Sequence, residues 1–393
     1  MRVPTAIGAR APFEYGPEGE AESQLGLERS EEDRAASPPG HAAYERGVGA
    51  RRRGDHAGAL AAFQRAIELE PDNSDYLLAA GREAQELRLF SEAEQLFGDA
   101  LAIVEAEVGP VHPRVAAALG ELGSVYVDQQ RYEEAEALYQ RALEINQQFH
   151  GHEHFEVAAA LNTLALLHRR RGRNEQAVPL LEEALAIEER VRGGEHPNVA
   201  ARLGALGMAH LEQGSFEEAR ELLERALYMR ENLFGSDDPE TAGALSGLAR
   251  VYSRQGLHAE AEPYLRRALA IHENSYGPAH PTVAMDLARL GGSYLAQGRD
   301  AEARPFVRRA LTTEEGARWS ANPQVSVVLL HLAEVAQAEG RPGDAEDLYQ
   351  WLLDVSEDTV GPRSTNTVWI STSYARYLAA NGRHEEAARL RNE

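Results

Sequence analysis

The chain repeats itself every 42 residues over most of its length. An alanine followed by leucine or isoleucine gives one step of 34 residues and then five of 42, at Ala66, Ala100, Ala142, Ala184, Ala226, Ala268 and Ala310. Two glycine registers keep the same period, at Gly109, Gly151, Gly193, Gly235, Gly277 and Gly361, and at Gly172, Gly214, Gly256, Gly298, Gly340 and Gly382. Trp319 is the one interruption of the first glycine register. Such self-similarity predicts a stack of one small structural unit.

Each period contains the pattern of two helices. Residues 197–213 and 215–234 carry apolar side chains at helical spacing, and each segment ends at a glycine. A polar residue stands ahead of each period's first helix, at His112, His154, His196, Asp238, His280, Asn322 and Ser364. It is followed by Pro113, Pro197, Pro239, Pro281 and Pro323, with Phe155 and Thr365 as the two replacements. A capping side chain followed by proline at the first helical position is typical of a helix start, so each period is expected to be a helical hairpin.

These residues resemble the tetratricopeptide repeat family, in the longer 42-residue variety typified by kinesin light chains. The third unit fills the family's small and large positions with Leu122, Gly123, Tyr126, Ala135, Tyr139 and Ala142, and the fifth with Leu206, Gly207, His210, Ala219, Leu223 and Ala226. The first two units resemble the ordinary 34-residue form, with Gly47, Ala59, Phe63, Ala66 and Pro71 in the first. The resemblance covers residues 41–393. It implies an all-α, right-handed superhelical solenoid of about nine helix-turn-helix repeats.

The expected domain organisation has three parts. Residues 1–40 are rich in Gly, Pro, Ala, Ser and Glu without a helical or strand period, which predicts a disordered acidic tail. Residues 41–108 hold two units of the 34-residue type, and residues 109–393 hold about seven of the 42-residue type in one continuous array. Small residues at Gly123, Ala165, Gly207, Ala249 and Gly291 are expected to let the two helices of a hairpin approach closely.

Composition excludes several classes of function. The formal net charge of −23 and pI of about 5.1 oppose binding to nucleic acid or anionic membranes. The chain has no Cys, and all 40 basic residues are Arg, so thiol nucleophiles, P-loop lysines and Schiff-base amines are excluded. No signal peptide or membrane span is recognisable, which predicts a cytoplasmic protein, and the Arg and Ala bias suggests a bacterial source.

The resemblance also implies where a partner binds. In the family, the first helix of each hairpin lines the concave face, and extended peptides are held there. The matching positions are Asn162, Arg169, Arg170, Arg250, Arg254, Arg289, His331 and Glu334. Guanidinium groups match carboxylates, so this basic track predicts an acidic peptide or one bound by its C-terminal carboxylate. The alternative is that Arg250 and Arg289 pair with Glu residues on neighbouring helices.

The family's repeated asparagine is present only as Asn162. The corresponding positions are Gly120, Gly204, Ser246, Ala288 and Leu330, which together with Met208 and Gly292 predict a wide, partly apolar channel. Trp369 also maps to a groove position and is a candidate anchor for a ligand or a second subunit, whereas Trp319 and Trp351 are expected in the core.

No pattern predicts catalysis. His150, His152 and His154 alternate in a loop, and imidazole nitrogens at such spacing can bind zinc or nickel, but His154 shares its register with the capping histidines. Glu133, Glu134, Glu217 and Glu218 stand at second-helix starts, where negative charge complements the helix N-terminus. We therefore expect no catalytic residue, cofactor or metal.

The sequence predicts a protein–protein interaction scaffold, monomeric, that holds a protein or peptide on its concave face. One alternative is a solenoid that self-associates through its ends or its convex face and has no groove ligand. The other is a metal-dependent activity at the histidine loop.

Overall fold

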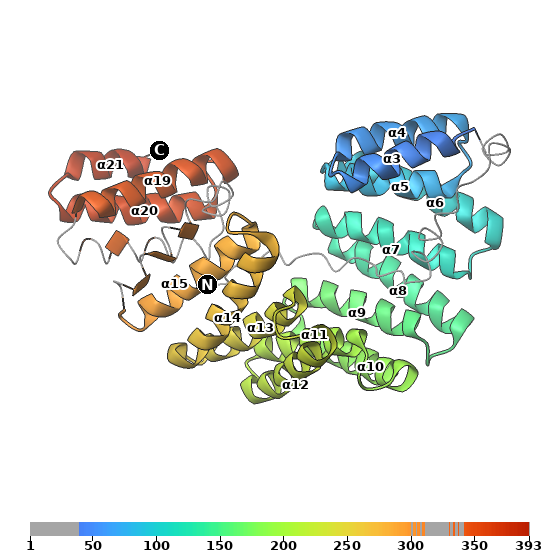
Figure 1. Cartoon of the computed structure of the whole chain (residues 1–393). Helices are drawn as coiled ribbons and strands as arrows, with labels where there is room; N and C mark the ends of the chain where they lie inside the picture. The colour runs from blue at the N-terminus through green and yellow to red at the C-terminus, as the bar shows by residue number, and fades with distance from the viewer. Residues whose placement is uncertain are drawn as a thin grey trace. The chain divides into compact units, whose positions relative to one another are not determined.

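The computed structural model describes residues 39–299 and 342–392, together with 302–303, 305–306, 309–310, 330, 333–334 and 337. These residues form α-helices joined by turns and contain no strand. The helices, labelled in Figure 1, are α3 His41–Arg52, α4 His56–Leu69, α5 Ser74–Glu86, α6 Phe90–Val108, α7 Pro113–Asp128, α8 Tyr132–His150, α9 Phe155–Arg170, α10 Asn174–Arg192, α11 Pro197–Gln213, α12 Phe216–Phe234, α13 Pro239–Arg254, α14 His258–Tyr276, α15 Pro281–Ala296, α19 Pro342–Val360, α20 Thr365–Ala380 and α21 His384–Asn392. The predicted tail lies, but for its last two residues, outside the described residues.

Within each of the two compact units described below, the helices form hairpins that stack in chain order, as the period predicts. We call α3, α5, α7, α9, α11, α13, α15 and α20 first helices, and α4, α6, α8, α10, α12, α14, α19 and α21 second helices. A first helix packs on the second helix of its own hairpin, and that second helix packs on the next first helix, as α7, α8 and α9 do. The prediction of a helical repeat solenoid is confirmed.

The chain divides into two compact units. One comprises the described residues up to Arg202, and the other those from Leu203 onward, so the boundary falls inside α11. Contacts within each unit are given separately below.

Both glycine registers have a conformational cause. In the first, Gly109, Gly151, Gly193, Gly235, Gly277 and Gly361 follow second helices with φ between 82° and 96°. In the second, Gly172, Gly214, Gly256, Gly298 and Gly382 follow first helices with φ between 69° and 87°. Side chains rarely adopt this left-handed region, which explains why glycine recurs there. Arg88 and Gln130 adopt it in the second register without being glycine.

The predicted caps are present wherever the structure describes them. The side chains of His112, His154, Asp238 and Ser364 accept hydrogen bonds from the backbone of their own first helix. Nδ1 of His196 accepts from the amide of Asn198 at 3.1 Å. Nδ1 of His280 accepts from Thr282 at 3.3 Å. Because an imidazole nitrogen accepts only when unprotonated, these caps need neutral histidine. Asn322 lies outside the described residues.

Small and large residues interlock inside each hairpin. A Cβ on Gly123 would lie 2.5 Å from the ring of Tyr139, and one on Gly81 would lie 2.6 Å from the ring of Phe97. Such a glycine therefore permits the close helix packing that the sequence predicts.

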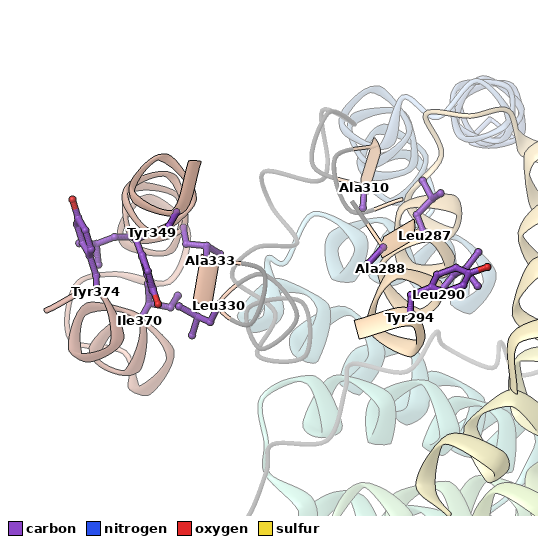
Figure 2. Close-up of a cluster of buried hydrophobic side chains, with 14 of the residues drawn as sticks. Leu287, Ala288, Leu290, Tyr294, Ala310, Leu330, Ala333, Tyr349, Ile370 and Tyr374 are labelled. Carbon is purple, nitrogen blue, oxygen red and sulfur yellow. The ribbon is translucent and has the colours of Figure 1, made fainter. Parts of the chain in front are cut away.

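In the second unit, a core cluster of buried side chains runs from Ala249 to Ala387. Figure 2 shows its labelled members in two groups. Leu287, Ala288, Leu290, Tyr294 and Ala310 form one, and Leu330, Ala333, Tyr349, Ile370 and Tyr374 form the other. Trp351 packs against this core, as predicted, and Trp319 lies outside the described residues.

Arginine clamps join consecutive repeats. Arg131 binds Glu94 of the preceding second helix at 2.8 Å and Glu134 of its own second helix at 2.9 Å. Arg299 and Arg383 repeat this arrangement with Glu262 and Glu302, and with Glu346 and Glu386. Glu262 also accepts hydrogen bonds from Tyr294 at 2.6 Å and from Arg266 at 2.9 Å. The acidic residues at second-helix starts thus serve an inter-repeat contact as well as the helix terminus.

Two buried polar contacts join a second helix to the next first helix. Nδ1 of His272 lies 2.5 Å from Asp286, and both side chains are buried. Glu188 is 1% exposed and lies 3.0 Å from Arg192 and 3.5 Å from Arg202. Each buried carboxylate therefore has a basic side chain beside it.

Candidate partner-binding surface on the first helices

In six first helices, α5, α7, α9, α11, α13 and α15, half-buried or exposed residues recur at helical spacing among buried ones. We call this set the open line of the helix. It consists of Asp75, Leu78, Arg82 and Glu86 in α5; Ala117, Glu121, Ser124 and Asp128 in α7; Ala159, Thr163, Leu166 and Arg170 in α9; Ala201, Ala205, Met208 and Glu212 in α11; Gly243, Arg250 and Arg254 in α13; and Met285, Arg289, Gly292 and Ala296 in α15.

Helix α13 shows how narrow the open line is. From Thr241 to Val251 every residue is buried except Gly243 and Arg250. A helix packed on both sides by neighbouring helices leaves only such a strip to solvent. A partner that approaches this part of α13 therefore meets the open line.

Side-chain contacts connect the open lines of consecutive first helices. In the first unit, Arg82 donates to Glu121 at 2.8 Å, and the neighbouring Gln85 donates to Asp128 at 2.7 Å. In the second unit, Nη1 of Arg250 lies 3.9 Å from the sulfur of Met208. These contacts connect α5 with α7 in the first unit and α11 with α13 in the second.

The predicted site residues of α9 differ in accessibility. Asn162 is 8% exposed, and its Oδ1 has no hydrogen-bond partner. Arg169 is half-buried and has a partner, whereas Arg170 is exposed and forms no ion pair with a described residue. Of these three side chains, Arg170 is the cation that α9 presents to solvent.

The predicted site residues of α13 and α15 also lie on open lines. Arg250 and Arg254 are exposed, and Arg254 forms no ion pair with a described residue. The Arg289 side chain is 32% exposed and lies 3.6 Å from Asp286 of its own helix. Burial lowers the pKa of Arg289, and Asp286 opposes this shift. The alternative prediction expected a Glu on a neighbouring helix, whereas the acidic neighbour of Arg289 is Asp286 on its own helix.

The remaining predicted residues lie toward the C-terminus. Trp369 is 41% exposed on α20, where it occupies the register of Ala117 and Gly243. Glu334 is exposed and has a partner, and His331 lies outside the described residues.

The register of Arg170 and Arg254 also carries carboxylates, which the prediction of a basic track omitted. Glu86, Asp128 and Glu212 occupy the same open-line position on α5, α7 and α11. The sign therefore alternates from Asp128 to Arg254. This alternation of charge could have been found in the sequence, because the five residues share one position of the 42-residue register.

Charged side chains of α7 and α9 affect the pKa of the Tyr139 hydroxyl. Burial raises the pKa of Tyr139, Arg170 lowers it, and Asp128 and Glu121 raise it further. Charges of both signs, from α7 and from α9, therefore act on this buried hydroxyl.

The histidine loop is built for capping and stacking. The rings of His150 and His154 stack with centroids 4.1 Å apart and an interplanar angle of 4°. Nδ1 of His154 accepts the amide hydrogen of Glu156 at 3.3 Å. Burial lowers the pKa of both histidines, and neighbouring basic side chains lower it further. In the part of the chain that the structure describes, no group of three or more His, Asp or Glu side chains is arranged to hold a metal ion.

No described helix is long and apolar enough to cross a membrane.

Comparison with known proteins identifies the repeat. The family model described as tetratricopeptide repeat matches residues 77–148, 114–187, 156–232, 207–273, 240–313 and 324–393, and a second model of the same description matches residues 40–73. The comparison with curated proteins found no match.

Several solved structures are similar. The kinesin light chain nearly identical TPR-like repeats of Podosopora anserina are 27% identical, with 52% of this chain and 97% of that chain covered and a TM-score of 0.46. BtubC (BKLC) from P. vanneervenii is 25% identical, with 60% and 93% covered and a TM-score of 0.48. The quorum sensor NprR from B. thuringiensis, in its apo form, shares the fold at 14% identity, with 89% and 96% covered and a TM-score of 0.58.

Proposed function

Because the chain belongs to the tetratricopeptide repeat family, whose stacked repeats serve as protein-interaction scaffolds, we propose that it holds an extended peptide or a partner protein along the open lines of its first helices. The observation that carries the proposal is the accessibility of α13, where Gly243 and Arg250 are the exposed residues between Thr241 and Val251. The chemistry is reversible binding, with acidic groups of the partner beside Arg170 and Arg254.

Two features support an extended partner. Small residues occupy the first open-line position at Ala117, Ala159, Ala201 and Gly243, so the partner's backbone can approach the helices closely. Polar and charged side chains follow along each line, and Asn162 adds an amide that can pair with a peptide main chain.

A displayed library of random peptides, selected on the immobilised full chain, tests the proposal. Arg254→Glu should lose the selected peptides, because it reverses a charge on the open line of α13. Arg225→Glu is the matched control, since it makes the same charge change on an exposed residue of the second helix α12. Equal binding to both variants, or no enrichment of any peptide on the wild type, would contradict the proposal.

A self-associating solenoid is the second candidate, because Val368 and Trp369 on α20 are 53% and 41% exposed. Light scattering over a range of protein concentrations distinguishes self-association from partner binding by a monomer. A mass that rises with concentration in the wild type and not in Trp369→Ala would favour self-association through α20.

A further inference from the structure

Helix α3 exposes a face that later first helices bury. In α9, Leu164 and Leu167 are 6% and 2% exposed and pack against the preceding second helix α8. Leu248 and Val251 of α13 are fully buried and pack in the same way against α12. These two positions of the register therefore face the hairpin that comes before.

In α3 the same two positions hold Arg46 and Gly49. Gly47 sets the register, because it packs against an aromatic ring of its own second helix as Gly123 does. Arg46 is exposed, Gly49 is half-buried, and no described helix precedes α3. A cation and a small residue thus stand where later repeats bury apolar side chains.

Arg53, which follows α3, extends this face. Its register holds Gln129 after α7 and Arg171 after α9. Gln129 donates to Glu94 at 3.2 Å, and Arg171 donates to Glu136 at 2.6 Å. Both carboxylates belong to the preceding second helix, so this position binds an acidic group of the element before it.

Arg46, Gly49 and Arg53 lie along one side of the first hairpin, and we call them the terminal face. Nη1 of Arg53 lies beside Gly49, 3.6 Å from where a Cβ would stand. Arg46 and Arg53 are exposed and form no ion pair with a described residue. The terminal face therefore offers two guanidinium groups to carboxylates.

The chain ahead of α3 carries a run of acidic residues. Glu31, Glu32 and Asp33 are consecutive, and Asp33 stands seven residues before Gly40. Gly40 is buried, and its amide donates to Glu70 at 2.7 Å. The acidic run is therefore tethered to a fixed point at the start of α3.

The tether is long enough to reach both arginines. Seven residues of extended chain span about 23 Å at about 3.3 Å per residue. Along the axis of α3, Arg46 and Arg53 lie about 9 Å and 20 Å from Gly40, at about 1.5 Å per residue. A segment that runs back along α3 thus brings carboxylates to either guanidinium.

We propose that the acidic segment 31–33 binds the terminal face of α3 within the same chain, with its carboxylates at Arg46 and Arg53. The tether favours this occupant over a second copy, because a short linker gives an effective concentration in the millimolar range. The contact covers the end of the array that stacking leaves open, and it is separate from the open lines.

Fluorescence anisotropy of a dye on Ser30→Cys measures the contact in the full chain. The chain has no cysteine of its own, so the label is specific. A segment bound to the terminal face turns with the whole protein and gives high anisotropy. The anisotropy should fall as salt rises, because salt screens exposed charges.

Charge reversal locates the contact. In Arg46→Glu/Arg53→Glu the ratio of bound to free segment should fall roughly tenfold, since two exposed ion pairs together contribute about that factor. Arg52→Glu is the matched control, because Arg52 is exposed on the same helix and lies outside the terminal face. It should keep the wild-type anisotropy, and circular dichroism of each variant shows whether the helices are retained.

A charge swap provides the converse test. Arginine at positions 31, 32 and 33 should free the segment in the wild-type background and restore high anisotropy together with Arg46→Glu/Arg53→Glu. Equal anisotropy in Arg46→Glu/Arg53→Glu and Arg52→Glu would overturn the proposal, and so would a charge swap that restores nothing. Anisotropy that rises as unlabelled protein is added would also overturn it, because the segment would then bind a second copy.

Discussion

Replacing Gly123 with alanine tests how closely the two helices of a hairpin approach. The new Cβ would lie 2.5 Å from Cε1 and 2.9 Å from Cδ1 of Tyr139, where ordinary contacts are 3.4–4 Å. The ring must therefore retreat by about 1 Å, but Tyr139 is 6% exposed and packed against Leu164 and Leu167. The substitution forces a shift in a filled core.

Two opposing effects decide how far Gly123→Ala changes the free energy of unfolding. In the interior of a helix, alanine is more favourable than glycine by about 1 kcal/mol. Overpacking a well-filled core costs about 1–3 kcal/mol, and contact with a rigid buried ring belongs at the upper end of this range. We expect Gly123→Ala to lower the free energy of unfolding by about 2 kcal/mol.

Urea unfolding of the full chain, followed by circular dichroism, measures the effect. Gly204→Ala is the matched control and should raise stability by about 1 kcal/mol, since its Cβ meets open space. Tyr139→Leu should make the Gly123→Ala change less costly, because Ala165 and Leu181 form this pair in the next repeat. Unchanged stability in Gly123→Ala, or a loss in Gly204→Ala, would refute the reasoning.

Two further predictions concern pH. Burial raises the pKa of Glu262, but hydrogen bonds from Tyr294, Arg266 and Arg299 outweigh burial and lower the pKa to about 2. The carboxylate therefore stabilises the fold at every pH above the pKa of Glu262 in the unfolded chain. This contribution is lost as the pH falls toward 2. Glu262→Gln should lower the free energy of unfolding at pH 7 by about 2 kcal/mol and flatten its decline in acid, which denaturation at several pH values measures. Burial also lowers the pKa of His154 and His196, so stability should fall as pH drops from 7 through about 6.5 toward their folded pKa. Asparagine at both positions keeps a capping acceptor and should remove that part of the pH dependence; an unchanged profile would contradict the capping role.

Features that depend on one hairpin were predictable from the sequence. The capping role of His112 and the positive φ of Gly109 follow from their positions at helix ends, and the structure confirms them. The close approach at Gly123 follows from a small residue opposite a large one. In each case the interacting groups are near in sequence, so local chemistry decides the outcome.

Features that depend on how hairpins stack were not predictable. The pairing of His272 with Asp286 joins helices of consecutive repeats and depends on their packing angle. The positive φ of Arg88 and Gln130 lies inside single hairpins and was not predictable either, because glycine is the residue that marks this conformation in a sequence. For the candidate surface, the register placed Arg170 and Arg254 correctly on first helices, whereas the burial of Asn162 required the structure.

The arginine clamps have a consequence for how such an array changes in length. Each clamp takes its arginine from one repeat and a glutamate from the repeat before it, as Arg131 does with Glu94. The block that holds Arg131 also holds Glu136, which pairs with Arg173 of the next repeat. A copy of such a block therefore brings the arginine for the junction behind it and the glutamate for the junction ahead, so its duplication leaves matched partners at the new junction. The reach of the surface can thus evolve in whole-repeat steps without the invention of new side chains.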